Sequence, residues 1–130
     1  MKSKRGKIKM IVEKTNTGFS AYAEDYPVYT VGGTIQELRE NIIDAFNLYY
    51  EDDDIQVKDS NIQLFFDLGL FFKHYPALNA KFLANKIGMN YTLLSQYVQG
   101  RKKPSAKQTE KIMKGIHEIG AELSELNLIR

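Results

Sequence analysis

Residues 79–107 read NAKFLANKIGMNYTLLSQYVQGRKKPSAK, and this stretch decides the fold of the second half of the chain. Asn79 and Asn90 each stand where a side chain can cap a helix, and Gly88 ends the first helix before the second begins. The spacing therefore predicts two short helices around a tight turn, which is the arrangement of a helix-turn-helix DNA-binding element.

The apolar residues of this stretch recur at helical spacing, so we expect one face of each helix to be buried. The residues expected to face inward are Phe82, Leu83, Ile87, Leu94, Tyr97 and Val98. A third helix is predicted to begin at Ser105, where Gln108 completes a capping box. Its apolar stripe, with the apolar residues after it, comprises Ile112, Ile116, Ile119, Leu123, Leu126, Leu128 and Ile129. This exceeds the needs of a small domain and predicts an oligomerisation helix in a homodimer or homotetramer.

The outward face of the second helix carries no acidic side chain. Hydroxyl and amide groups both donate and accept hydrogen bonds, which suits them to base edges in the major groove. The loop that follows adds three cations beside a helix start, where phosphates bind well. We therefore expect double-stranded operator DNA to contact Asn90, Tyr91, Thr92, Ser95, Gln96, Arg101, Lys102 and Lys103.

Charge is divided unevenly along the chain. Residues 1–66 carry eight Lys and Arg against eleven Asp and Glu, a net charge of −3, whereas residues 67–130 carry ten against five, a net charge of +5. The basic half contains the DNA-binding pattern, as attraction to phosphate requires. An acidic half is repelled by nucleic acid and favours a protein partner, so we expect two domains, 1–66 and 67–130.

The composition excludes several classes of protein. With no cysteine among 130 residues, disulfides and thiolate metal sites are excluded. No apolar run approaches the length of a membrane span, and the basic start lacks the apolar core of a signal peptide. We therefore expect a cytoplasmic protein.

The first half alternates apolar and polar residues as strands do. Strands are expected at residues 7–12, 19–24, 28–31 and 62–66, with a helix between the last two that starts in a capping box at Thr34. The inner face of that helix is predicted to carry Leu38, Ile42, Ala45, Phe46 and Tyr49. This gives a β-β-β-α-β antiparallel sheet with the helix on one face.

The predicted fold class is therefore α+β, a small sheet domain followed by an all-α helix-turn-helix domain. Between them, a helix over residues 68–75 is expected to pack Phe71, Phe72 and Tyr75 under the helix-turn-helix.

The chain resembles the HicB family of antitoxins over residues 9–123. The matching motifs are Val12-Glu13-Lys14, Gly18-Phe19-Ser20-Ala21-Tyr22, Asp25-Tyr26-Pro27, Gly33-Thr34, Leu93-Leu94-Ser95-Gln96-Tyr97, Gly100 and Lys102-Lys103-Pro104-Ser105. The resemblance implies a reduced RNase H-like sheet domain that binds and blocks a small basic ribonuclease toxin, HicA, an mRNA interferase. It also implies a C-terminal domain that represses the operon encoding both proteins.

Aromatic residues near the strand turns are candidates for toxin binding, because aromatic side chains are strong anchors of protein interfaces. Tyr22 alternates with Ala21 and Ala23, so it faces the opposite side of the sheet together with Glu24. For Tyr29, a core position and an outward position remain equally open. The expected toxin-binding residues are Tyr22, Glu24, Asp25, Tyr26 and Tyr29.

Two other functions compete with that of an antitoxin. A nuclease of RNase H chemistry needs carboxylates that converge on paired metal ions. The acidic residues Glu13, Glu24, Asp25, Asp44 and Asp52–Asp54 are more simply solvated surface groups, and His74 and His117 lack catalytic partners, so we expect no enzyme, catalytic residue, metal or cofactor. The alternative is a helix-turn-helix regulator that responds to a ligand or a protein and has no toxin partner.

Overall fold

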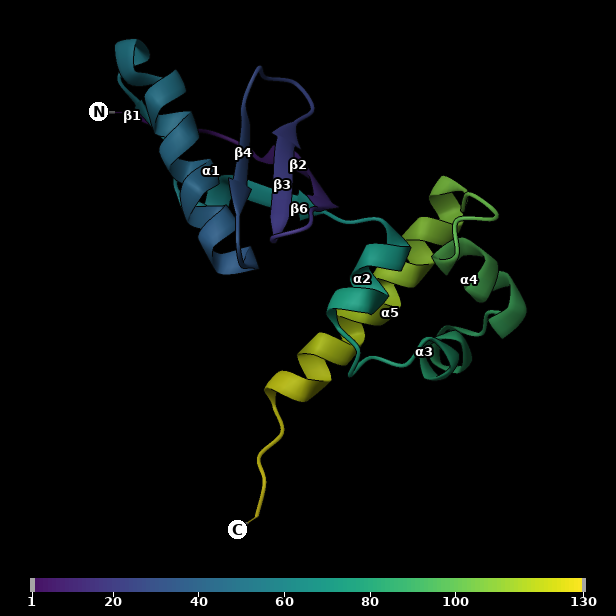
Figure 1. Ribbon diagram of the computed structural model, residues 1–130. Helices are drawn as coiled ribbons and strands as arrows, with labels where there is room; N and C mark the ends of the chain where they lie inside the picture. Colours follow the sequence, from purple (N-terminus) through teal and green to yellow (C-terminus); the bar gives the residue numbers. More distant parts are fainter. Residues whose placement is uncertain (1, 130) are drawn as a thin grey trace. The chain divides into compact units, whose positions relative to one another are not determined.

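The computed structural model describes residues 2–129, and the chain divides after Asp67 into two compact units. The described residues form five α-helices and two small sheets, so the fold is mixed α and β as expected (Figure 1). None of the helices within residues 2–129 has the length and apolarity needed to cross a membrane.

The first unit is built on a four-stranded sheet with the order β4-β3-β2-β6. Its strands are β2 (Ile8–Lys14), β3 (Phe19–Ala23), β4 (Tyr29–Gly32) and β6 (Ile62–Phe65). The expected antiparallel sheet is wrong in one respect, because β6 pairs with β2 in parallel. β4 and β6 run in the same direction, so the chain must cross the sheet between them, and α1 (Ile35–Tyr49) makes that crossing.

The core of this unit lies between the sheet and α1. Alternate residues of the strands point toward the helix and are buried, and the helix contributes a stripe at helical spacing. The buried residues of the two layers are Ile8, Met10, Val12, Phe19, Ala21, Ala23, Leu38, Ile42 and Phe46. Thr34 caps the helix as predicted, its side chain accepting from the N–H of Glu37 at 3.0 Å.

Tyr49 was expected on the inner face of α1 but is exposed, and Tyr50 is buried in its place. Although the helix ends at Tyr49, the N–H of Tyr50 still donates to the carbonyl of Phe46 at 2.9 Å, so Tyr50 continues the buried stripe four residues after Phe46. The Tyr26 ring packs edge-on against Phe46 and Tyr50, with ring centroids 5.4 and 6.2 Å away. This aromatic group closes the core at the end of the helix.

A second sheet was not foreseen in the sequence. The short strands β1 (Lys2–Ser3) and β5 (Ile55–Gln56) pair in parallel, and two 3-10 turns, η1 (Glu51–Asp53) and η2 (Asp59–Asn61), flank β5. Asn61 is buried and donates to the carbonyls of Lys4 and Gly6 at 3.0 and 2.9 Å. The N-terminal segment is therefore held by backbone hydrogen bonds to residues 54–56 and by an amide side chain, rather than by apolar periodicity.

Side chains of α1 also reach the two outer strands of the larger sheet. Asn41 donates to the carbonyl of Val31 on β4 at 2.7 Å. Arg39 donates to the carbonyl of Ile62 on β6 at 3.3 Å and forms an ion pair with Asp59 at 2.8 Å. A carbonyl on each outer strand thus has a partner within the unit.

Residues 68–129 of the second unit form four α-helices. They are α2 (Leu68–His74), α3 (Ala80–Ile87), α4 (Tyr91–Val98) and α5 (Ala106–Ser124). The predicted caps at Asn79, Asn90 and Ser105 are confirmed, since each side-chain oxygen accepts backbone N–H groups of the following helix. Between α3 and α4 the chain turns at Gly88, whose φ of 68° suits glycine.

A compact core joins α3, α4 and α5. Its buried residues are Leu83, Ala84, Met89, Leu94 and Ile112. A Cβ added at the buried Gly115 would overlap Ile87 Cγ2 and crowd Leu83 Cδ1, so the glycine allows α5 to pass close to α3.

Two expected core residues of this unit lie outside it. Phe82 is 64% exposed, because the buried stripe of α3 follows Leu83, Ala84 and Ile87. Tyr75 is also exposed, since α2 ends at His74, whereas Phe72 packs against the core as expected.

Candidate functional site

The N-terminus of α4 is shaped by Asn90. Its side-chain oxygen accepts the N–H groups of Thr92 at 2.8 Å and Leu93 at 3.3 Å. That oxygen is committed to the cap, so Asn90 orients the helix, and its proposed role in reading bases is limited to the remaining amide group.

The polar side chains predicted to face DNA do not project equally. Tyr91 and Thr92 are exposed at the first turn of α4, while Ser95 and Gln96 are half-buried. The Ser95 hydroxyl accepts from Gln99 Nε2 at 3.3 Å. The first turn of α4 is therefore the part most able to enter a groove, and Gln99 joins the candidate surface from the exposed end of the same helix.

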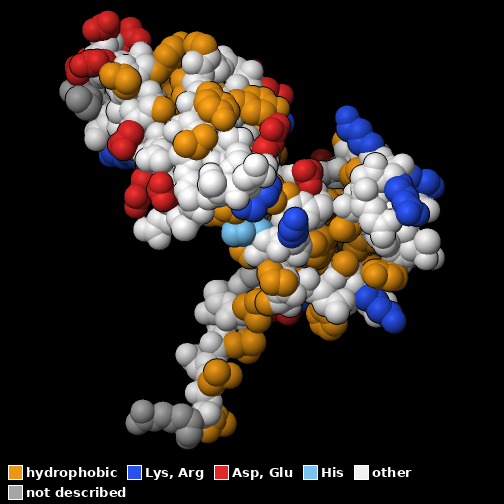
Figure 2. Space-filling view, viewed as in Figure 1, with side chains coloured by type: hydrophobic (Ala, Val, Ile, Leu, Met, Phe, Trp, Pro, Cys, Tyr) orange, Lys and Arg blue, Asp and Glu red, His pale blue; other side chains and the backbone are white. Residues whose placement is uncertain are grey.

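The basic loop is folded against the C-terminal end of α4. The N–H groups of Arg101 and Lys102 both donate to the carbonyl of Gln96, at 2.9 and 3.3 Å, and Gly100 supplies the positive φ that this turn requires. The side chains of Arg101, Lys102 and Lys103 are exposed. Figure 2 shows Lys and Arg side chains along the side of this unit where α4 lies in Figure 1.

The loop leads directly into the N-terminus of α5. Ser105 caps this helix by accepting the N–H of Gln108 at 3.1 Å, and the first turns of α4 and α5 carry no acidic residue. Three exposed cations, two helix N-termini and a polar helix face thus lie on neighbouring segments. This arrangement is able to bind phosphate groups and to place side chains near base edges.

The sheet of the first unit has one face that α1 does not cover. The strand register places Tyr29 beside Tyr22, Tyr22 beside Ile11 and Ile11 beside Phe65, in one row across all four strands. Tyr29, Tyr22 and Phe65 are 66%, 42% and 41% exposed. Figure 2 shows hydrophobic side chains exposed on the strand region of this unit. We call this row, with the exposed Val31, the open sheet face.

The structure sorts the expected toxin-binding residues into two groups. Tyr22 and Tyr29 lie on the open sheet face, which decides the position of Tyr29. Glu24 lies beside that face in an ion pair with Lys9 at 3.3 Å, and Asp25 is exposed in the following turn. Tyr26 does not join them, because its ring packs against Phe46 and Tyr50 at the end of α1.

Two members of the open sheet face, Ile11 and Phe65, were missed in the sequence. Both side chains point outward from strands whose inward residues are also apolar. The alternation of apolar and polar residues therefore did not show which of these apolar side chains are exposed. Lys9 Nζ lies 4.5 Å from the centre of the Phe65 ring and also pairs with Glu24, which places charge beside the apolar row.

Tyr26 and Tyr50 pack against each other at the end of α1, and the pKa of Tyr50 is raised. Burial raises the pKa of Tyr50 well above its usual range, and a side-chain hydrogen bond with Tyr26 raises the pKa further. This pair holds the turn that carries Asp25 against the helix, and we assign it a structural role.

The remaining acidic residues and histidines are dispersed. Within residues 2–129, no three His, Asp or Glu side chains gather closely enough to hold a metal ion. Glu13, Asp44 and the segment 52–54 are exposed, His117 is exposed, and the ring of His74 lies edge-on to Tyr75 at 4.7 Å.

Comparison of the chain with protein families, curated proteins and solved structures finds no significant match.

Proposed function

We propose that the chain is a HicB-like antitoxin that neutralises a HicA-like ribonuclease and represses its own operon by binding operator DNA. In this proposal α3 and α4 act as a helix-turn-helix, and the first unit acts as a reduced RNase H-like toxin-binding domain. The observation that carries it is the pairing of a capped, acid-free α4 with a basic loop that is hydrogen-bonded to the end of the same helix. No catalytic residue, metal or cofactor is assigned, and the protein acts in the cytoplasm.

For DNA binding, the second unit places the cations of the basic loop at a fixed position relative to α4. Because Arg101 and Lys102 are tied through their backbone to Gln96, cations that bind phosphates would fix how α4 lies in the major groove. Tyr91 and Thr92, at the exposed first turn, would then lie deepest, and Gln96 and Gln99 would face bases further along.

For toxin binding, the open sheet face offers rigid aromatic side chains beside acidic groups. Residues 1–66 carry a net charge of −3, which suits a basic ribonuclease and predicts fast, salt-sensitive association. Once water is excluded, Tyr22 and Tyr29 would supply most of the binding free energy, as aromatic residues do at the centre of interfaces.

Operator binding is tested by gel shift with the DNA upstream of the gene. Gln96→Ala should reduce discrimination between the operator and unrelated DNA by about 1–3 kcal/mol, since it would remove one base contact. Gln63→Ala, an exposed glutamine on the sheet, is the matched control and should have no effect. Equal operator affinity and specificity in both variants would show that α4 does not read the sequence.

Neutralisation is tested by co-expression with the product of the neighbouring reading frame, which should be a short basic ribonuclease. Tyr22→Ala and Tyr29→Ala should weaken rescue of growth, whereas Tyr75→Ala, an exposed tyrosine of the second unit, should not. A gene that stands alone, with intact operator binding, would favour the alternative of a regulator without a toxin partner.

A further inference from the structure

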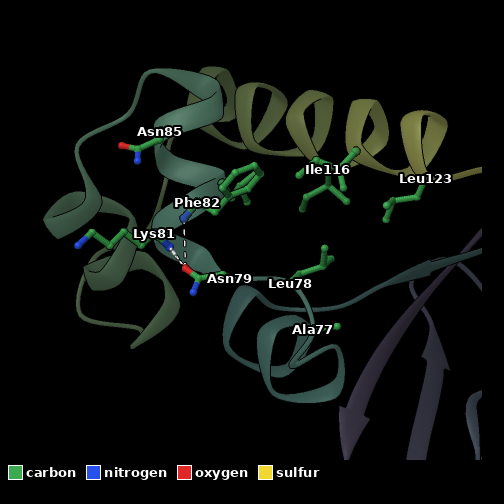
Figure 3. A pocket seen from close by; sticks show the side chains of 10 residues that line it. Ala77, Leu78, Asn79, Lys81, Phe82, Asn85, Ile116 and Leu123 are labelled. Carbon is green, nitrogen blue, oxygen red and sulfur yellow. Dashed lines mark hydrogen bonds between the residues drawn. The ribbon is translucent and has the colours of Figure 1, made fainter. Parts of the chain in front are cut away.

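An apolar groove runs along the second unit between α3 and α5. Its volume is about 550 Å³. Its apolar lining comes from Leu78, Phe82, Leu83, Ile116, Ile119 and Leu123. Figure 3 shows the labelled Phe82, Leu78, Ile116 and Leu123 side chains around one hollow, which accounts for the exposure of the Phe82 ring. Large contiguous apolar patches exposed on a protein surface commonly mark a site of interaction with another molecule.

A second apolar feature follows α5. After Ser124 the chain leaves the helix and runs away from it (Figure 1). This C-terminal segment, residues 125–129, carries Leu126, Leu128 and Ile129, and the last two are 98% and 100% exposed. Three large apolar side chains on one short segment are therefore left in water beside a unit that has an unfilled apolar groove.

We infer that the groove of each copy binds the C-terminal segment of a second copy, in a reciprocal exchange that forms a two-fold dimer. The same two surfaces then meet twice, as an isologous interface requires. The segment is poorly placed to fill its own groove, since Leu123 already lines the groove and the N–H of Leu126 bonds to the Leu123 carbonyl at 3.3 Å, which continues the direction of the helix. Residues 125–129 also contain no glycine or proline to reverse the chain.

The exchange leaves the candidate DNA surface accessible. No residue that lines the groove belongs to α4 or to the loop at Arg101–Lys103, and the groove lies toward the opposite end of α5 from that loop. A dimer of this kind would present two copies of α4 to one palindromic site, a consequence that rests on the proposed operator binding. The dimer itself does not depend on that function, so it is measured without DNA.

Oligomeric state gives the first test. By sedimentation equilibrium the full chain should be a dimer, while a chain that stops after Ser124 and the variant Phe82→Ser should both be monomers. Met113→Ser removes an exposed apolar residue of α5 that does not line the groove, and should remain a dimer. Circular dichroism should show unchanged helix content in Phe82→Ser, because the ring is largely exposed. A monomeric full chain, or a dimer that survives truncation, would overturn the inference.

Disulfide trapping distinguishes exchange from a segment that folds back on its own chain. The protein has no cysteine, so introduced thiols report only on the chosen pair. A Lys81→Cys chain mixed with a differently tagged Leu128→Cys chain should give a cross-linked heterodimer, whereas Lys107→Cys, at the far end of α5, should not cross-link with Leu128→Cys. If the Lys81→Cys, Leu128→Cys double variant forms only a bond within one chain, the exchange is refuted. A trapped dimer that binds no operator would refute the proposed function instead.

Discussion

The basic loop after α4 provides the sharpest quantitative prediction. Replacing Arg101, Lys102 and Lys103 by alanine removes three exposed cations that are held beside α4 and the start of α5. If each neutralises one phosphate, the slope of log affinity against log salt should become about 2.7 less negative, at about 0.9 per phosphate contact. A roughly fourfold rise in salt should then cost the wild type about 40-fold more affinity than the variant.

The assay is a fluorescence anisotropy titration with operator DNA over a series of salt concentrations. The matched control replaces Lys2, Arg5 and Lys58, which are also one arginine and two lysines, exposed on the first unit. Its slope should equal that of the wild type, although its net charge falls by the same amount. Equal slopes in all three proteins, or an equal loss in the control, would refute the idea that the loop holds the phosphate backbone.

Three further predictions concern side-chain packing in the second unit and the pKa of Tyr50 in the first. Gly115→Ala should destabilise the second unit by about 1–3 kcal/mol in urea unfolding, because the added Cβ overlaps Ile87, whereas Gly120→Ala, with open space around it, should not. Leu94→Ala should cost about 2–5 kcal/mol in the same experiment, since Leu94 is fully buried. The raised pKa of Tyr50 stabilises the first unit below the unfolded tyrosine pKa, and this contribution is lost as pH rises above about 10. Tyr50→Phe should therefore reduce the loss of stability at alkaline pH, followed by circular dichroism, and an unchanged pH profile would contradict the assignment.

The second half of the chain was the more predictable half. Its helix starts depend on local chemistry, in which Asn79, Asn90 and Ser105 each satisfy N–H groups two or three residues ahead. Such signals need no knowledge of the rest of the fold. The exposure of Phe82 was not predictable in this way. Helical periodicity places Phe82 on the apolar side of α3, but in a single chain its ring lines an open groove and is not covered by the core.

In the first half, the errors concern contacts between distant segments. β6 pairs with β2, and β1 pairs with β5, across more than 45 residues of sequence, so neither pairing leaves a local pattern. The candidate toxin site shows the same limit. Tyr22 and Glu24 follow from strand alternation, whereas Tyr26 lies in a turn, where alternation ends and the side chain packs under the helix.

The side chains that α1 extends to both outer strands have a consequence for recognition. Because Asn41 and Arg39 each occupy one carbonyl on β4 and β6, a strand added from another protein at either edge would find one acceptor fewer. In the proposed complex with a toxin, side chains of the open sheet face would therefore contribute more to recognition than backbone pairing at the sheet edges. If the chain has the proposed function, recognition by side chains can change one residue at a time, so substitutions at Tyr22 or Tyr29 could separate related antitoxin–toxin pairs without any change of fold.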